Sequence, residues 1–284
     1  MALDPSLLSP GQQYLPGILG GLGPLAHVQF ERRILDRGRL RGARGDGGHP
    51  VWIVASAAST PDRTRALLEG GESPVRHLTA FALLLERAGA DALFVACNAA
   101  HAWHADVQGA LRIPWVHLMD ITAAAIRAAY PEGTRVGLLA ADGTLTAGLY
   151  QRALEARGLV AVAPPIDSPA QALVRSAVYD PETGIKATGS RVSREATDGL
   201  AAAALWCVRQ GAQVVVAACT EVSVGLTPEA FEVAPLVDPI TVAADLLLDF
   251  AFGACGPAAL YAAAGPAGVS GSTAPGFPRG PARS

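Results

Sequence analysis

The sequence has little charge, few aromatic side chains and no long apolar run. Charged residues make up 17% of the 284 positions, aromatic residues 6%, and the formal net charge is −3. No run of arginines is long enough to follow a phosphate backbone, which argues against a nucleic-acid partner. Gly, Asp, Arg or Pro interrupts every apolar stretch before about 18 residues, the length that a membrane span needs. We therefore expect no nucleic-acid and no membrane partner.

Cysteine and lysine are also scarce. Four cysteines in a chain of this length do not make the dense disulfide framework of a small secreted domain. The opening segment MALDPSLLSPGQQYLP lacks a basic stretch followed by an apolar one, so we expect no secretory signal and a cytoplasmic location. Lys186 is the only lysine among 22 Lys and Arg residues, which makes it a candidate for function.

Half of the residues are hydrophobic, as in a folded globular protein. Short apolar runs alternate with longer segments of helical period, a pattern typical of parallel sheets covered on both faces by helices. The expected strands are 15–19, 51–56, 92–96, 115–118, 135–140, 159–163, 214–218 and 234–237. The expected helices are 24–37, 74–88, 99–111, 121–129, 144–157, 169–178, 193–210 and 239–252.

An internal repeat divides the chain into two halves. GILGGLGPLAHVQFERRIL begins at Gly17, and GLLAADGTLTAGLYQRALE begins at Gly137, 120 positions later. A second pair of segments ends apolar strands at Cys97 and Cys219, 122 positions apart. The repeat predicts an α/β fold of two similar doubly wound parallel-sheet (Rossmann-like) domains, related by pseudo-twofold symmetry, with the active site in the cleft between them.

The expected domain boundaries follow from the repeat and from composition. The first α/β domain comprises residues 14–126 plus 234–262, and the second comprises residues 132–232. Residues 1–13 and 265–284 are rich in Pro, Gly, Ser and Ala, so we expect them to be poorly ordered.

Cys97 and Cys219 are the strongest candidates for chemistry. Each ends a buried strand and precedes a polar residue, Asn98 or Thr220, at the expected start of a helix. Free amide groups and the positive end of the helix dipole stabilise a thiolate there. A thiolate is a base and a neutral thiol an acid. A single such cysteine is more often a small core residue, but two at equivalent repeat positions favour function.

Two other interpretations of the same residues are weaker. Cys97, His101 and His104 have a spacing that suits a metal, but no fourth ligand is evident, so we expect no metal. His101 itself either stabilises a thiolate, orients the loop or is structural. The glycines of GGLGP fit dinucleotide binding poorly, because Pro24 follows and no acidic residue lies about 20 positions on. Gly23 instead lets the backbone approach a small substrate.

Five motifs, in order along residues 15–250, resemble the aspartate/glutamate racemase superfamily and in particular its aspartate racemase branch. They are GGLGP at 20–24, PDRT at 61–64, CNAAH at 97–101, GIK at 184–186 and CTE at 219–221. The paired CN and CTE motifs are the specific part of the resemblance, since the glycine motif alone is weak.

The resemblance implies an isomerase, a racemase for a small-molecule amino acid that works as a homodimer without metal or pyridoxal phosphate. Cys97 and Cys219 would be the acid/base pair, with one thiolate removing the α-proton and the other thiol delivering a proton to the opposite face. Arg63 and Lys186 would contact the substrate's distal carboxylate. The other implied substrate contacts are Gly23, Asn98, Ala99, Thr220 and Glu221.

Some positions depart from the aspartate racemase pattern. Ala99 replaces the threonine of CNT, and His27 stands where GPLAT has a threonine, which makes His27, like His101, an auxiliary candidate. Aspartate is the favoured substrate, with glutamate or a related amino acid next. The alternatives are an isomerase, epimerase or decarboxylase acting on another carboxylic acid, and a non-catalytic amino-acid-binding relative. Retention of both Cys97 and Cys219 favours proton exchange on two faces.

Overall fold

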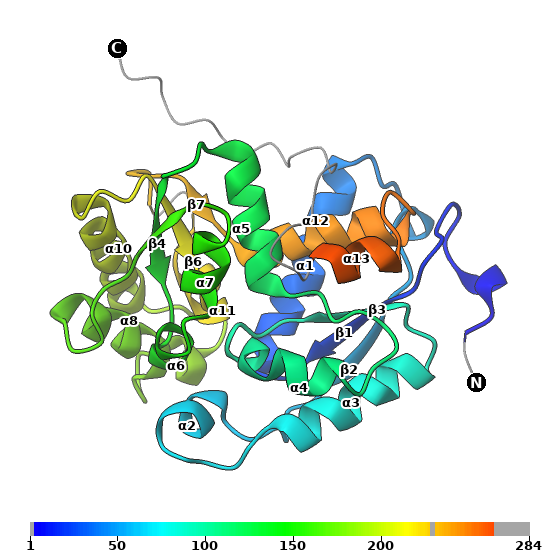
Figure 1. The fold of residues 1–284 in the computed structure, drawn as a ribbon, viewed down its shortest axis with the longest axis horizontal. Coiled ribbons are helices and arrows are strands. Elements are labelled where there is room, and N and C mark those ends of the chain that lie inside the picture. Colours follow the sequence, from blue (N-terminus) through cyan, green and yellow to red (C-terminus); the bar gives the residue numbers. More distant parts are fainter. Residues whose placement is uncertain (1–2, 228–230, 264–284) are drawn as a thin grey trace. The chain divides into compact units, whose positions relative to one another are not determined.

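The computed structural model describes residues 3–227 and 231–263, which form two α/β units (Figure 1). The first unit comprises residues 3–121 and 240–263, and the second comprises residues 122–227 and 231–239. Each unit has its own parallel sheet, which confirms the predicted α/β class with two parallel-sheet units. Within the described residues, no helix is long and apolar enough to cross a membrane.

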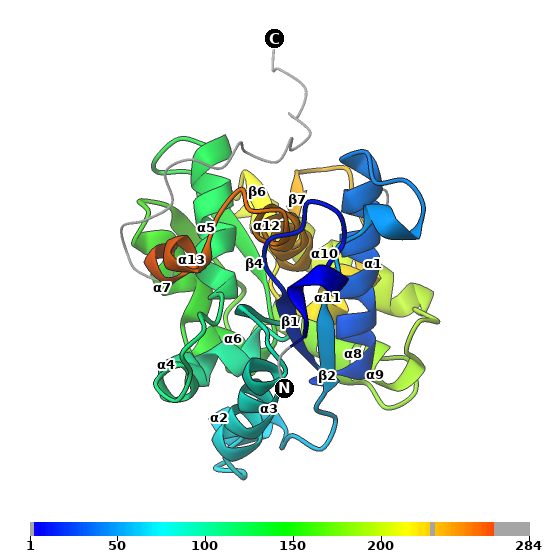
Figure 2. The ribbon, with the colours of Figure 1, turned by 90° about the vertical axis from the view of Figure 1, so that its right-hand side faces the viewer.

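The sheet of the first unit has three parallel strands in the order β2-β1-β3. They are β1 (Pro16–Gly20), β2 (Ile53–Ser56) and β3 (Ala92–Val95), and Figure 2 shows β2 beside β1. The helices of this unit are α1 (Pro24–Leu40), α2 (Arg63–Leu68), α3 (Val75–Arg87), α4 (His104–Gln108), α12 (Pro239–Ala251) and α13 (Pro257–Ala263), with short 3₁₀ turns η1 (Pro5–Leu7), η2 (Asp46–Gly48) and η3 (Ala99–Trp103). Helix α5 (Leu118–Ala129) runs on into the second unit.

Side chains of β3 point alternately to the two faces of this sheet and pack against helices on both. Leu93 packs with Leu85 of α3 in one apolar cluster. The next residue, Phe94, points to the other face, because side chains alternate along a strand. There its ring lies 6.4 Å from that of Phe30 in α1 and 6.3 Å from that of Phe250 in α12. Both faces are thus covered, and only the strand ends remain for chemistry.

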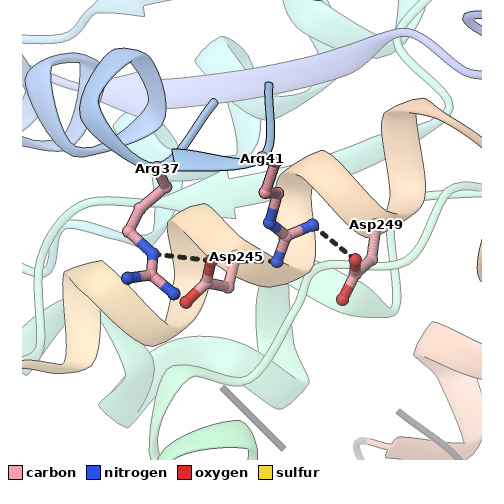
Figure 3. Close-up of polar contacts among 4 residues, drawn as sticks. All are labelled: Arg37, Arg41, Asp245 and Asp249. Carbon is pink, nitrogen blue, oxygen red and sulfur yellow. Dashed lines mark hydrogen bonds and ion pairs between the residues drawn. The ribbon is translucent and has the colours of Figure 1, made fainter. Parts of the chain in front are cut away.

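Helices α1 and α12 are also joined by an ion-pair network (Figure 3). Asp245 accepts from Arg37 Nε at 2.8 Å and from Arg41 Nη2 at 2.9 Å. Asp249 accepts from Arg41 Nη1 at 2.5 Å. The Asp245 side chain is 6% exposed, so its charge depends on these guanidinium groups for stabilisation. The network joins α12 to α1 within the first unit.

The sheet of the second unit has four parallel strands in the order β5-β4-β6-β7. They are β4 (Arg135–Leu139), β5 (Val160–Val162), β6 (Val214–Ala217) and β7 (Leu236–Val237). Its helices are α6 (Asp142–Thr146), α7 (Leu149–Glu155), α8 (Pro169–Tyr179), α9 (Ile185–Thr188), α10 (Arg194–Arg209) and α11 (Thr220–Gly225). Helix α10 packs on β4 and β6 and carries α8 against it, whereas α7 packs on β5 (Figure 1).

The internal repeat is present in strand order and in register. β2-β1-β3 matches β5-β4-β6, and β7 extends only the second sheet. Gly17 pairs with Leu93 in the first sheet, and Gly137 pairs with Val215 in the second. These partners are 120 and 122 positions apart, the same offsets as in the sequence. The two cysteines therefore follow equivalent strands, β3 and β6.

Several elements differ from the sequence predictions. The strand expected at 234–237 in the first domain pairs with β6 of the second unit, and only the helix after it joins the first unit. The strand expected at 115–118 is reduced to one bridge, between Leu93 and Trp115, because α5 begins at Leu118. The helix expected at 144–157 is interrupted at Gly148, which has φ 62°. Sequence reasoning missed the short helices α2, α9 and α13, whereas α11 begins at Thr220, where a helix start was expected.

The N-terminal segment, for which we expected poor order, makes specific contacts from residue 3 onward. The Gln12 side chain donates to the carbonyls of Tyr14 and Val51 and accepts from the Val51 amide. The Gln13 amide donates to the Ala251 carbonyl of α12. These bonds satisfy backbone groups that would otherwise remain unpaired. The tail expected at 265–284 lies outside the described residues.

Candidate active site

Cys97 lies two residues after the end of β3 and is 7% exposed. The strand is fully buried, so its end delivers the cysteine to the carboxyl edge of the sheet. The next residues turn into η3 rather than the α-helix expected over 99–111. The Cys97 carbonyl accepts a hydrogen bond from Nδ1 of His101 at 2.9 Å. The loop that carries the thiol is thereby fixed through its backbone.

The hydrogen bonds of His101 define its protonation. His101 Nδ1 lies 2.9 Å from the Cys97 carbonyl, and Nε2 lies 3.2 Å from the donor Trp115 Nε1–H and 3.3 Å from the Val116 carbonyl. A proton on Nδ1 satisfies the Cys97 and Trp115 contacts, whereas a proton on Nε2 satisfies only the Val116 contact, so the geometry favours Nδ1–H. The opposite tautomer would set two N–H groups against each other and a lone pair against the Cys97 carbonyl. Burial, and then the neighbouring His117 and His104, hold the pKa of His101 well below its ordinary range. His101 is a neutral imidazole that orients the loop.

Two more histidines surround His101. The His101 ring centroid lies 5.4 Å from that of His117 and 6.4 Å from that of His104. His104 Nε2 donates to the Trp115 carbonyl at 2.8 Å, and His117 Nδ1 lies 2.8 Å from Asp120 Oδ2. Each ring thus has a protein partner. Among the described residues, no group of three His, Cys, Asp or Glu side chains is arranged to hold a metal ion.

Cys219 follows β6 and is the N-cap of α11, again 7% exposed. Its Sγ donates to Oε2 of Glu221 at 3.0 Å, and Thr220 Oγ1 donates to the same oxygen at 3.0 Å. Lys186 Nζ lies 3.0 Å from the other oxygen, Oε1. The Glu221 carboxylate thus contacts the thiol of Cys219, the hydroxyl of Thr220 and the ammonium group of Lys186.

The electrostatics of this group keep Cys219 protonated. Burial and the negative charge of Glu221 raise the pKa of the Cys219 thiol well above its ordinary value. Burial alone would raise the pKa of Glu221, but Lys186 and the hydrogen bond from Cys219 hold it below its usual range. Burial alone would lower the pKa of Lys186, but Glu221 raises it. The Glu221 amide at the helix start lowers the pKa of Cys219, as expected from the sequence, but burial and the adjacent carboxylate outweigh it.

Arg63 is the first residue of α2, which sequence reasoning missed. Its Nη1 donates to the carbonyls of Thr60 and Pro61, at 3.0 and 2.8 Å, and its Nη2 donates to the Leu22 carbonyl at 2.7 Å. The guanidinium thus ties the PDRT loop to the glycine loop that ends at Gly23. Its Nε is buried with no hydrogen-bond partner among the described residues.

The candidate residues form two groups, one in each unit. The first unit holds the glycine loop, Arg63 and the Cys97 loop, and the second holds Lys186 and the Cys219 turn. The first group comprises Gly23, His27, Arg63, Cys97, Asn98, Ala99 and His101, and the second comprises Lys186, Cys219, Thr220 and Glu221.

A family model, Asp/Glu/hydantoin racemase, matches residues 19–247. The chain belongs to this family. The broad specificity amino-acid racemase RacX of Bacillus subtilis (strain 168) is 29% identical over 143 residues, which are 50% of this chain. The matched part spans 61% of RacX.

Solved structures agree in fold. An aspartate racemase of Picrophilus torridus has a TM-score of 0.70 at 24% identity, covering 84% of this chain and 94% of the other. An aspartate racemase homologue from Pyrococcus horikoshii OT3 has a TM-score of 0.66 at 23% identity, covering 84% and 99%. At these identities the likeness shows the fold, and the chemistry must be argued from the side chains.

Within this racemase-family chain, two structural residues went unnoticed in the sequence. Trp115 holds the tautomer of His101, and His117 pairs with Asp120 beside it. Neither lies in a recognisable motif, because both approach the Cys97 loop from the segment before α5, 14 or more positions away. Only the unusual density of histidine and tryptophan over residues 101–117 signals them.

Proposed function

We propose that the chain is a cofactor-independent amino-acid racemase in which Cys97 and Cys219 exchange the α-proton of the substrate. The carrying observation is the equivalence of the two thiols. Each follows a matching buried strand, β3 or β6, in units that share strand order and register. Ligands of parallel α/β sheets bind at this edge, and membership of the racemase family supports the reaction type.

The reaction balances with two sulfur atoms alone. One thiolate takes the α-proton, which leaves a carbanion whose charge spreads into the α-carboxylate. The other thiol gives its proton to the opposite face, so the configuration is inverted and the two sulfurs have exchanged roles. Burial and Glu221 keep the pKa of Cys219 raised. Cys219 is therefore the proton donor of the resting protein in this proposal.

Polar groups beside each thiol bind the substrate in this proposal. Asn98 and Thr220, with nearby amides, hold the α-carboxylate and stabilise the charge that develops on it, an effect of about 10²–10³ in rate per donor. Arg63 keeps a buried Nε–H without a partner among the described residues, which suits a distal carboxylate. The Lys186 ammonium group has three N–H donors, one of which is directed to Glu221, so two can contact a substrate carboxylate. Glu221 acts mainly on Cys219 and Lys186.

Aspartate is the first substrate to test, with glutamate next. The aspartate racemases that share the fold support this order. A wider amino-acid range is supported by the likeness to RacX, which is named as broad in specificity. Ala99 offers no hydroxyl where the family pattern has one. The four free cysteines and the family resemblance support a cytoplasmic homodimer as part of the proposal.

Hydrogen exchange at the α-carbon tests the proposal directly. The protein is incubated in deuterated water with each enantiomer of aspartate, glutamate and a panel of neutral amino acids, and deuterium at Cα is followed by NMR. Cys97→Ser and Cys219→Ser should each lower racemisation by about 10²–10⁴-fold. A variant that keeps one thiol should still exchange the enantiomer facing that thiol.

Cys255→Ser provides the matched control, because it makes the same atomic change at a partly exposed cysteine outside both groups. It should leave exchange unchanged. Exchange that survives in the Cys97 and Cys219 variants for both enantiomers would contradict the two-thiol mechanism. Absence of exchange with every amino acid, together with saturable binding of one of them, would favour a non-catalytic binding protein.

A further inference from the structure

His27 lies on the glycine loop in a way that leaves one ring nitrogen unused. The ring packs on the bare Cα of Gly20, where a Cβ would come within 2.4 Å of His27 Cβ and Cγ. Nδ1 accepts a hydrogen bond from the Gly21 amide at 3.1 Å. Two glycines and one hydrogen bond therefore fix the ring, and a larger residue at position 20 would displace it.

This contact decides where the proton of His27 resides. A nitrogen that accepts from an amide N–H carries no proton, so in the neutral ring the hydrogen is on Nε2. No described residue accepts a hydrogen bond from Nε2. The side chain is partly exposed, so this N–H is accessible. His27 is thus a rigid donor whose direction is set by the backbone.

The donor stands at the strand edge that carries the proposed base. β1 and β3 are adjacent, with Leu19 paired to Val95, and the Ala96 amide donates to the Leu19 carbonyl at 3.2 Å. The segment Gly20–Gly21 therefore follows β1 at the same edge of the sheet at which the Cys97 loop follows β3. His27 reaches the end of β1 from the first turn of α1.

We infer that His27 is a specificity-determining residue whose Nε2–H donates to an oxygen of the substrate, a carboxylate oxygen of the amino acid. This inference rests on the proposed racemase function and deepens it. A fixed imidazole N–H discriminates by geometry, because a ligand with an oxygen at one place accepts its hydrogen bond and a ligand without that oxygen leaves the donor unpaired in the complex. In this inference His27, from the first turn of α1, supplies a polar contact to the substrate that Ala99 cannot make.

Two substitutions separate the two nitrogens. His27→Asn places an amide oxygen near the position of Nδ1, keeps the bond from the Gly21 amide and loses the distal donor. His27→Gln places an amide N–H₂ near Nε2, keeps the distal donor and loses the acceptor for Gly21. Thermal midpoint, KM and kcat are measured for both variants with each amino acid that the wild type exchanges, and L- and D-aspartate binding is measured by calorimetry.

The expected result is a rise of KM and Kd by about 10–100-fold in His27→Asn at an unchanged midpoint, with His27→Gln within about threefold of wild type in KM despite a lower midpoint. The reverse order, with Asn active and Gln impaired, would show a purely structural histidine and overturn the inference. If the wild type exchanges the α-hydrogen and both variants keep its KM and Kd, the inference is overturned and the proposed function stands. Absence of both exchange and binding in the wild type overturns both proposals together.

A second readout needs no activity. Nitrogen-15 spectra of the imidazoles, assigned with His27→Asn, should show His27 Nδ1 unprotonated and Nε2 protonated in the free protein. Aspartate should shift the Nε2 resonance, whereas a protonated Nδ1 in the free protein would contradict the argument.

Discussion

The Sγ of Cys219 lies 3.0 Å from Oε2 of Glu221, two residues further along the chain, and donates to it. A thiol that donates to an ionised carboxylate gives up its proton reluctantly, since the product would set two negative charges side by side. Lys186, 3.0 Å from the other oxygen, keeps that carboxylate ionised. The three residues form a unit in which the lysine acts on the cysteine through the glutamate.

Substitutions at the two charged members should move the pKa of Cys219 in opposite directions. Glu221→Gln removes the adjacent negative charge, so the pKa of Cys219 should fall. Lys186→Met removes the positive charge, which lowers the pKa of Cys219 in the native chain, so that pKa should rise. Thiolate ultraviolet absorbance against pH, taken as the difference from the same protein with Cys219→Ser, measures both. Shifts of the same sign in the two variants would show that the charges of the pair do not control the thiol.

The buried histidine cluster should make folding sensitive to mild acid. The pKa of His101 is held below its ordinary value of 6.5 in the folded chain by burial and by His117 and His104. Below pH 6.5 the unfolded chain therefore binds a proton that the folded chain does not, and stability falls with decreasing pH. The slope is about 1.4 kcal/mol per pH unit for one such group.

Urea unfolding at several pH values between about pH 7 and pH 5 measures this slope, because this interval spans the ordinary pKa of histidine. His101→Gln should reduce this slope by the contribution of one proton, about 1.4 kcal/mol per pH unit. This expectation does not depend on the stability of the variant at neutral pH. His77→Gln, in helix α3 and outside the cluster, should leave the slope unchanged. An equal slope in wild type and His101→Gln would show that His101 is protonated in the folded chain or that another group carries the acid sensitivity.

Much of the fold was predictable because it rests on local patterns. Buried parallel strands are continuous apolar runs, and the 120-residue offset between Gly17 and Gly137 implied one topology used twice. Short elements were not predicted correctly from the sequence, and the reason is physical. β7 has two residues, and its place is decided by pairing with β6, which no local pattern records. The break at Gly148 likewise depends on a left-handed backbone that only the tertiary path requires.

The candidate site was predictable in its residue types but not in its contacts. Motifs identified Cys97, Cys219 and Lys186, whereas the partner of each came from packing. Glu221 was predicted from its motif as a substrate contact, and its hydrogen bond with Cys219 and ion pair with Lys186 could not be derived from that motif. Trp115, which fixes the tautomer of His101, comes from a distant segment. Side-chain hydrogen bonds between segments cannot be derived from spacing, since they depend on angles set by the assembled core.

The ion-pair network between α1 and α12 should matter more than a surface pair on the same helix. Asp245→Asn leaves Arg37 and Arg41 without the carboxylate oxygen that both share, and its side chain is 6% exposed. We expect a loss of about 2–3 kcal/mol. Asp36→Asn breaks the Arg32–Asp36 pair, whose side chains are 71% and 49% exposed, and should cost less than about 0.5 kcal/mol. Urea midpoints compare the two, and equal losses would contradict a role for burial in this network.

Glycines at matching places in the repeat should respond alike to an added methyl group. A Cβ at Gly17 would lie 2.9 Å from Ala90 Cβ, and a Cβ at Gly137 would lie 2.9 Å from Cys207 Cβ and 3.3 Å from Ala212 Cβ. Cys207 belongs to helix α10, and Ala90 lies in the loop between α3 and β3, so relief would require that helix or that loop to move away from the sheet. Gly17→Ala and Gly137→Ala should therefore each cost about 1–3 kcal/mol by overpacking.

Gly47→Ala is the control for this pair, because a Cβ there would meet nothing within 4 Å and the backbone is not left-handed. It should leave the unfolding free energy within about 0.5 kcal/mol of wild type. Thermal and urea unfolding of the three variants give the comparison. A large loss at Gly137 with none at Gly17 would mean that the loop after α3, which carries Ala90, can move away from β1 more easily than α10 can move away from β4. The close glycine contacts would then not be an equivalent packing requirement of both repeats.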